Sequence, residues 1–76
     1  MNEDLRALVS EVYDVPKEKV DINLDIKHLP TWNSLNRFRF VTAIESKFNV
    51  SLTMEEILSM DSISSIVHVL RGKGVS

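Results

Sequence analysis

WNSLNRFRFVTAIESKF, residues 32–48, is the stretch that decides the fold. Its residues 37–40 alternate basic and aromatic side chains and on their own would suit a short strand. Apolar residues continue beyond them at helical spacing, so we expect a helix over residues 34–48. Phe38 then points away from the core, towards solvent or a partner. The candidate core face of this helix is made of Phe40, Val41, Ile44 and Phe48.

The residues before this stretch predict one helix and one long loop. From Leu5, apolar residues recur at i, i+3, i+4 and i+7, which predicts a helix over residues 3–13 with Asn2 as its N-cap. Because the residue before a proline avoids the helical region, this helix should end before Pro16. Residues 14–33 keep no helical period but contain several apolar side chains, so we expect an ordered loop that lies across the core.

The residues after the stretch predict two more helices. Thr53 and Glu56 have the spacing of a capping box, which predicts a short helix ending at about Leu58. Asp61 or Ser62 can cap the last helix. The core face of that helix is made of Ile63, Ile66, Val67 and Leu70. The fold class is therefore all-α: a four-helix bundle of three principal helices and a short third one, with a long ordered loop between the first two.

Length and composition limit what such a bundle can do. A chain of 76 residues is expected to form a single domain over residues 1–76, with one modest core, and to be a monomer. Such a domain is too small to build an elaborate catalyst. The sequence has no cysteine, so helix packing alone must hold it, and any thiol chemistry must come from an attached group.

Charge and hydropathy exclude further classes. A net charge of −2 argues against a nucleic-acid partner, and no apolar run approaches the length of a membrane span. The acidic start has no basic region before an apolar stretch, so we expect a cytoplasmic location. The charge is distributed unevenly. Residues 1–30 are acidic on balance, whereas residues 37–47 are basic on balance.

Asn33-Ser34-Leu35 at the start of the central helix resembles the Asp-Ser-Leu motif of acyl carrier proteins. The resemblance extends over nearly the whole chain, because the loop after the first helix and the order of all four helices also follow that family. It implies that a phosphopantetheinyl transferase attaches 4'-phosphopantetheine to the Ser34 hydroxyl, and that the thiol of this arm carries acyl groups as thioesters. A helix N-terminus suits the attached phosphodiester, because its free N–H groups and dipole favour negative charge. The competing interpretation of Ser34 is an ordinary N-cap.

Two departures from the family pattern bear on partners. Asn33 replaces the usual Asp, which keeps a capping residue but removes a charge beside the serine. Arg37, Arg39 and Lys47 lie in a helix that is strongly acidic in typical fatty-acid carriers. Because like charges at an interface are costly, the standard partners of fatty acid biosynthesis should bind poorly. We expect a dedicated polyketide, specialised-lipid or saccharide-modification pathway whose enzymes present a neutral or acidic docking surface. The other interpretation is that these cations form a solvated helix face.

The resemblance also implies contacts around the arm. We expect Leu35, Arg37, Phe38 and Arg39 to dock the acyl-loading and acyl-processing enzymes, with core packing as the alternative for the two apolar residues. The resemblance implies that Ile57 and Met60 border a pocket for the acyl chain, but we expect core packing for both. Trp32 either pins the loop to the helix or flanks the arm.

Other functions are weaker interpretations. A hydrolase using Ser34, His28 and Asp25 would need an oriented triad and a cleft that so small a core has little room to build, so we expect no catalytic residues. Two lone histidines do not make a metal site. An aminoacyl or peptidyl carrier, or an unmodified helical interaction module that has lost the arm, remains compatible with the residues.

Overall fold

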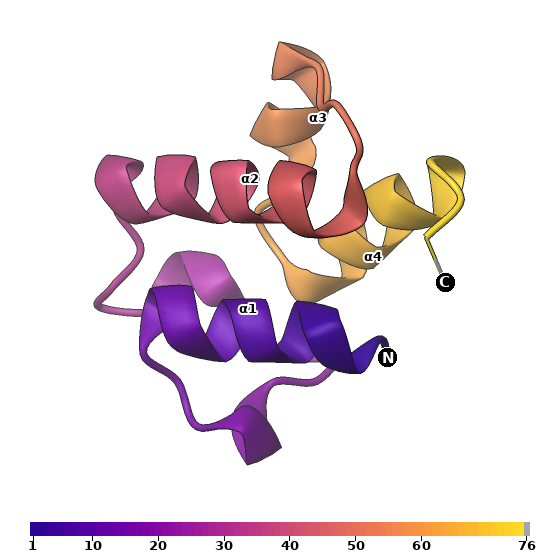
Figure 1. Cartoon of the computed structure of the whole chain (residues 1–76). Helices are drawn as coiled ribbons and strands as arrows, with labels where there is room; N and C mark the ends of the chain where they lie inside the picture. Colours follow the sequence, from indigo (N-terminus) through magenta and orange to yellow (C-terminus); the bar gives the residue numbers. More distant parts are fainter. Residues whose placement is uncertain (76) are drawn as a thin grey trace.

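Two long antiparallel helices form the centre of the molecule in the computed structural model, which describes residues 1–75. Helix α1 (Glu3–Tyr13) lies alongside α2 (Ser34–Phe48), and the two run in opposite directions (Figure 1). Helix α3 (Met54–Ser59) lies on the opposite side of α2 from α1, and α4 (Ile63–Gly72) completes the bundle (Figure 1). The described residues contain four α-helices and no strand, which confirms the predicted all-α bundle with a short third helix.

Local signals in the sequence account for the helix ends. The Asn2 side chain accepts hydrogen bonds from the amides of Asp4 and Leu5, as expected for the N-cap of α1. Asp14 ends α1 in the left-handed conformation (φ 54°), which short polar side chains tolerate, just before Val15-Pro16. At α4, Ser62 rather than Asp61 is the cap, and it accepts a hydrogen bond from the Ser65 amide.

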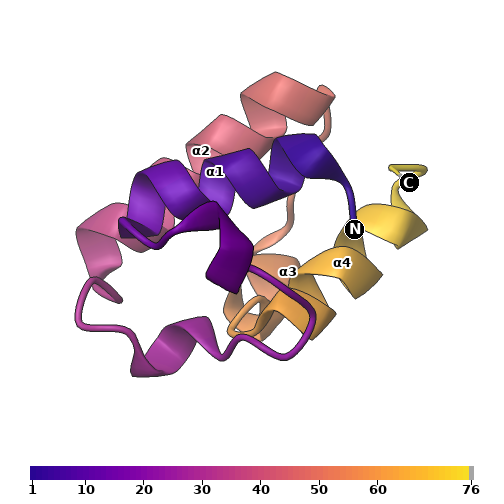
Figure 2. The same cartoon turned by 90° about the horizontal axis from the view of Figure 1, so that it is seen from below.

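The loop between α1 and α2 is ordered, as predicted, but it also contains two short 3-10 turns that its sequence pattern does not indicate. These turns are η1 (Lys17–Lys19) and η2 (Ile26–His28). The loop passes beneath α1 and returns to the start of α2 (Figure 2). Its backbone is tied to α4 by a hydrogen bond of 3.4 Å from the Ile63 amide to the Leu24 carbonyl. The fold therefore holds Ser34 at the end of an anchored loop.

The core lies between α1, α2, α4 and this loop. All its buried residues within the described range 1–75 belong to the hydrophobic types. The helices supply Leu5, Val9, Val12, Tyr13, Phe40, Val41, Ile44, Ile63, Ile66 and Leu70, and the connecting segments supply Val15, Val20, Ile26 and Met60. The predicted core residues Phe48 and Val67 are only partly buried, and Ile22 of the loop is exposed. The loop thus supplies three buried side chains, Val15, Val20 and Ile26, which explains why it is ordered without helical periodicity.

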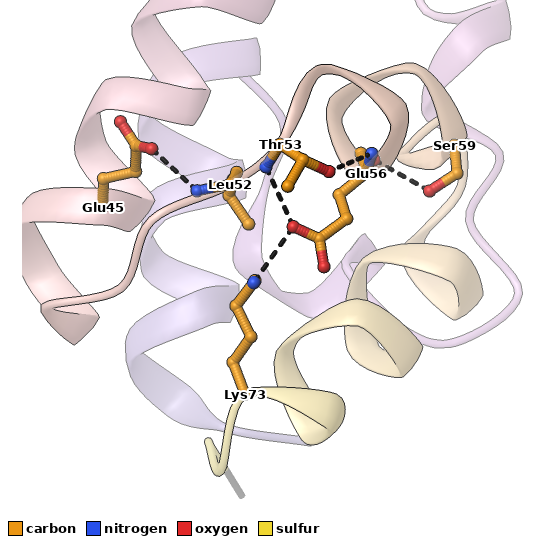
Figure 3. Close-up of polar contacts among 6 residues, drawn as sticks. All are labelled: Glu45, Leu52, Thr53, Glu56, Ser59 and Lys73. Atoms are coloured by element: carbon orange, nitrogen blue, oxygen red, sulfur yellow. Dashed lines mark hydrogen bonds and ion pairs between the residues drawn. The ribbon is translucent and has the colours of Figure 1, made fainter.

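Helix α3 is held differently, because none of its side chains is fully buried. Thr53 and Glu56 form the predicted capping box (Figure 3). The Glu56 carboxylate also lies 3.0 Å from the Lys73 ammonium, which joins α3 to the end of α4. Just before α3, the Leu52 amide donates to the Glu45 carboxylate of α2 at 2.9 Å. Polar contacts therefore position this helix beside α2.

Candidate functional site

Ser34 is the first residue of α2, and its side chain is exposed. The N-cap is Asn33, whose side chain accepts a hydrogen bond of 2.8 Å from the Asn36 amide. The interpretation of Ser34 as the N-cap is therefore wrong, because its neighbour takes that place. Within residues 1–75 the Ser34 hydroxyl has no hydrogen-bond partner. It is a free nucleophile that the fold does not use for structure.

The backbone around Ser34 is suited to a phosphate group. The amides of Ser34 and Leu35 lie in the first turn of α2, where an α-helix has no acceptor for them, and no other acceptor is present among the described residues. The first turn contains no acidic residue that would compete with an anion. A phosphodiester on Ser34 would therefore lie beside free donors and the positive end of the helix dipole.

A groove of about 570 Å³ begins at Ser34 and runs between α2 and α3. It is lined by Ser34, Arg37, Phe38, Val41, Thr42, Glu45, Met54, Ile57 and Leu58. Most of this lining is apolar, with the charged groups of Arg37 and Glu45 on the α2 side. Ile57 thus borders the groove, as the resemblance implied. Met60 does not, because it is buried in the core with only 3% of its surface exposed.

The solvent side of α2 carries a second set of side chains, at positions i, i+3, i+4 and i+7 from Leu35. This outward stripe is made of Leu35, Phe38, Arg39 and Thr42, all of which are exposed. Leu35 and Phe38 have 67% and 69% of their surface exposed, so neither belongs to the core. Arg39 donates a hydrogen bond of 2.9 Å to the Asn36 side chain and keeps its charge at the surface. The expected orientation of Phe38 is confirmed.

Arg37 is engaged within the molecule rather than fully extended into solvent. Its Nη2 donates a hydrogen bond of 2.9 Å to the carbonyl of Ile57 in α3. Its guanidinium carbon lies 5.2 Å from the centre of the Trp32 ring, within the range of a cation–π contact. Trp32 in turn stacks on Tyr13 of α1 at 5.9 Å. Trp32 therefore pins the loop to the bundle, and Arg37 joins that loop to α3.

Asn36 is a positioning residue that the sequence reasoning missed. Its side-chain NH2 group donates a hydrogen bond of 2.9 Å to the carbonyl of Thr31, while its side-chain oxygen accepts the hydrogen bond from Arg39. The hydroxyl of Thr31 donates a hydrogen bond of 2.6 Å to the Tyr13 carbonyl at the end of α1. The chain leading to Ser34 is thus fixed at several points. A polar residue within the first turn of a helix was the available signal, but its partner in the loop follows only from the fold.

The candidate triad is not assembled. His28 and Asp25 do form a contact, with Nε2 and Oδ2 3.3 Å apart, but His28 is exposed, Asp25 is partly buried, and neither forms a hydrogen bond with the Ser34 hydroxyl among the described residues. No group of three or more potential metal-ligating side chains is found among residues 1–75. No helix in this described part is long and apolar enough to span a bilayer.

Among residues 1–75, the pKa values of Tyr13 and Glu56 depart from the ordinary range, and both groups lie in segments that flank the site. Burial raises the pKa of Tyr13 to about 12, and the positive charge of Arg37 opposes this rise. The pKa of Glu56 is lowered, first by the hydrogen bond from the Thr53 amide and then by Lys73. Neither group lies at the Ser34 hydroxyl, so we assign neither a chemical role.

Residues 3–70 match the family described as "Phosphopantetheine attachment site". The match extends from the start of α1 to the last turns of α4, so the chain belongs to this family. Members bind 4'-phosphopantetheine covalently and act as non-catalytic carriers, which agrees with the resemblance to acyl carrier proteins. The comparison with curated proteins found no match.

Proposed function

We propose that this chain carries acyl groups as thioesters on a 4'-phosphopantetheine arm attached to Ser34. The observation that supports this most strongly is the Ser34 hydroxyl itself, which is exposed and unbonded at the first residue of α2, within a chain of this family. A serine whose only role was to cap the helix would accept a hydrogen bond from a first-turn amide. Asn33 accepts that bond instead.

The attachment reaction needs little from the carrier. The Ser34 hydroxyl attacks the phosphorus that bears the pantetheine group of coenzyme A, and a phosphodiester forms. The pyrophosphate bond breaks, adenosine 3',5'-bisphosphate leaves, and a base of the phosphopantetheinyl transferase accepts the hydroxyl proton. The carrier's part is to expose the hydroxyl and to provide the first-turn amides of Ser34 and Leu35 for the new anion.

The groove beside Ser34 favours an acyl cargo over an aminoacyl or peptidyl one. Phe38, Val41, Met54, Ile57 and Leu58 supply an apolar lining on both sides of it. Such a lining stabilises a hydrocarbon chain by removing it from water, but gives little to a charged amino group. The acyl chain would stay bonded to the arm's thiol as a thioester and would extend into the groove between α2 and α3.

Processing enzymes would meet the arm at the adjoining part of α2, where we place docking contacts at Leu35, Arg37, Phe38 and Arg39. Arg37 contributes mainly its charge, because its donors are partly used by Ile57. Helix α2 carries three cations, Arg37, Arg39 and Lys47, against the single carboxylate of Glu45. This balance supports a dedicated pathway that produces a polyketide, a specialised lipid or a modified saccharide.

The test is intact mass after incubation with a broad-specificity phosphopantetheinyl transferase, coenzyme A and Mg²⁺. Wild type should gain one phosphopantetheine and Ser34→Ala none. Ser46→Ala is the matched control, because Ser46 is an exposed serine of the same helix that does not line the groove. Modification of Ser34→Ala would disprove the assignment of the attachment residue.

The rival function is a helical interaction module without an arm. If wild type gains no mass while a known carrier is converted in the same tube, the Asn33→Asp variant is tested next. Conversion of that variant alone would show that the missing charge limits recognition by a general transferase. Failure of both, in well-folded protein, would support the module. Mass spectrometry of the protein purified from its own cells would then identify the cargo class.

A further inference from the structure

The exposed apolar residues of this chain are concentrated beside Ser34. Leu35 and Phe38 on α2 are joined by Met54 and Leu58 on α3, with 69% and 61% of their surface exposed. Phe38, Met54 and Leu58 line the same groove, so they form one continuous surface. We call Leu35, Phe38, Arg39, Met54 and Leu58 the docking face. Monomeric proteins rarely expose such clusters unless something binds there.

Some charged side chains around this face already have partners within the molecule, and others do not. Glu45, the only carboxylate of α2, accepts a hydrogen bond from the Leu52 amide at 2.9 Å. Lys47 lies 3.9 Å from the Asp4 carboxylate of α1. On α3, Glu56 is paired with Lys73, which leaves Glu55 as the exposed carboxylate there.

Arg39 is therefore the exposed cation at the centre of the α2 half of the face. Its bond partner is the neutral Asn36 side chain, and no carboxylate within residues 1–75 forms an ion pair with it. Its neighbour Phe38 is the largest exposed apolar side chain of the face. An aromatic anchor beside an unpaired arginine is a common composition for the energetic centre of an interface.

We propose that the docking face binds partner enzymes whose own surface presents carboxylates opposite Arg39, around an apolar hollow that receives Phe38. The inference rests on the proposed carrier function and specifies its partners. Charge complementarity determines the choice, because a basic partner would place like charges against Arg37 and Arg39. A carrier with an acidic helix binds enzymes with a basic surface. The partner of this carrier would have the opposite, acidic surface.

The experiment uses a defined pair of probes and the unmodified full chain. One probe is a fatty-acid ketosynthase with a basic docking surface, and the other is the same enzyme with those Lys and Arg residues replaced by Glu. Dissociation constants are measured by calorimetry at 50 and 200 mM salt. We expect the acidic probe to bind at least about tenfold more tightly at low salt, with a smaller preference at high salt.

Variants of the chain connect this preference to the face. Arg39→Glu should remove or reverse it, and Phe38→Ala should weaken binding of the acidic probe about tenfold. The control is Lys19→Glu, which makes the same charge change at an exposed position in η1, remote from α3. Circular dichroism checks that each variant is folded. Because no arm is needed, the result is independent of whether Ser34 is modified.

Several outcomes would overturn the proposal. Equal or tighter binding of the basic probe would show that the face does not select acidic partners. An effect of Arg39→Glu no larger than that of Lys19→Glu would show that only net charge matters. Sedimentation of the same samples provides the third check. Concentration-dependent self-association that is lost in Phe38→Ala would show that a second copy of the chain, and not an acidic partner, covers the face.

Discussion

The guanidinium of Arg37 lies over the indole ring of Trp32, 5.2 Å from its centre, and at the same time donates to the Ile57 carbonyl at 2.9 Å. One side chain thereby connects the loop before Ser34 to the helix across the groove. The carbonyl of Ile57 lies in the last turns of α3, where the helix dipole favours a cation. The width of the groove beside Ser34 therefore depends on Arg37.

Replacing Arg37 should loosen α3 without unfolding the other helices. Arg37→Ala removes a cation–π contact and a charge-assisted hydrogen bond, so we expect the free energy of unfolding to fall by about 2 kcal/mol. Arg37→Lys should recover only part of this, because an ammonium cannot lie flat on Trp32 and donate to Ile57 in the same geometry. Urea unfolding followed by fluorescence of Trp32, the only tryptophan, measures both changes.

Hydrogen exchange distinguishes this role from a general loss of stability. Amides of α3 should exchange faster in Arg37→Ala than in wild type, while those of α1 retain their relative protection. Arg39→Ala is the matched control, because Arg39 is a neighbouring exposed arginine whose hydrogen bond is to Asn36 of its own helix rather than to α3. Equal acceleration of α1 and α3 would contradict a specific connection to α3.

Asn33 and Ser34, the first two residues of the motif, should have separate effects on stability. Asn33→Ala removes the cap from the Asn36 amide and should cost about 1 kcal/mol of unfolding free energy. Ser34→Ala removes a hydroxyl that makes no bond within the described residues, so stability should change by less than about 0.5 kcal/mol. Thermal unfolding of the unmodified proteins measures this contrast. A large loss in Ser34→Ala would mean that the hydroxyl has a structural role.

Much of this fold could be predicted because its signals are local. Asn2, Thr53 and Ser62 lie beside the amides that they cap, and the apolar spacing of each helix is visible without a partner. The two 3-10 turns carry no such pattern, since each is only one turn long. The loop's apolar residues indicated an ordered segment but not its path across the core.

The site was predicted less completely, for a physical reason. The motif led to the proposal that Ser34 is the attachment residue, and the helical spacing correctly predicted that Phe38 lies at the surface. Arg37 was expected to face a partner, and its side chain also contacts a ring five residues before it and a carbonyl 20 residues after it. A cation has many possible partners in a sequence, and only the packed structure selects among them.

Low pH should weaken the contacts that hold α3 in place, because it protonates Glu56. Its pKa is lowered in the folded state, so the stability it contributes is present above the ordinary value of 4.5 and is lost as pH falls through the folded value. Glu56→Gln should lower the Tm by a few degrees at pH 7, and the difference from wild type should vanish in acid. Glu55→Gln is the control, because Glu55 is the exposed neighbour. An undiminished difference at low pH would contradict the role of the Glu56 charge.

The hydroxyl of Tyr13 is buried without a hydrogen-bond partner in the described residues, although its ring packs against Trp32 and Phe40. A buried hydroxyl without a partner costs free energy, whereas the ring supplies the favourable packing. Tyr13→Phe keeps the ring and removes the hydroxyl. We therefore expect this variant to be more stable than wild type by about 1 kcal/mol at pH 7, measured by urea unfolding.

The same substitution should change the response to alkali. Burial raises the folded pKa of Tyr13 to about 12 from its ordinary value of 10.0, because the phenolate is poorly solvated in the core. Ionising the phenol is therefore harder in the folded state than in the unfolded state. The free energy of unfolding does not change with pH through this group below the unfolded pKa, and it falls as pH rises from there through the folded pKa. Wild type should therefore lose stability more steeply than Tyr13→Phe between about pH 10 and 12. Parallel losses in the two proteins would show that other groups govern alkaline unfolding, and a less stable Tyr13→Phe at pH 7 would show that the hydroxyl is bonded in solution.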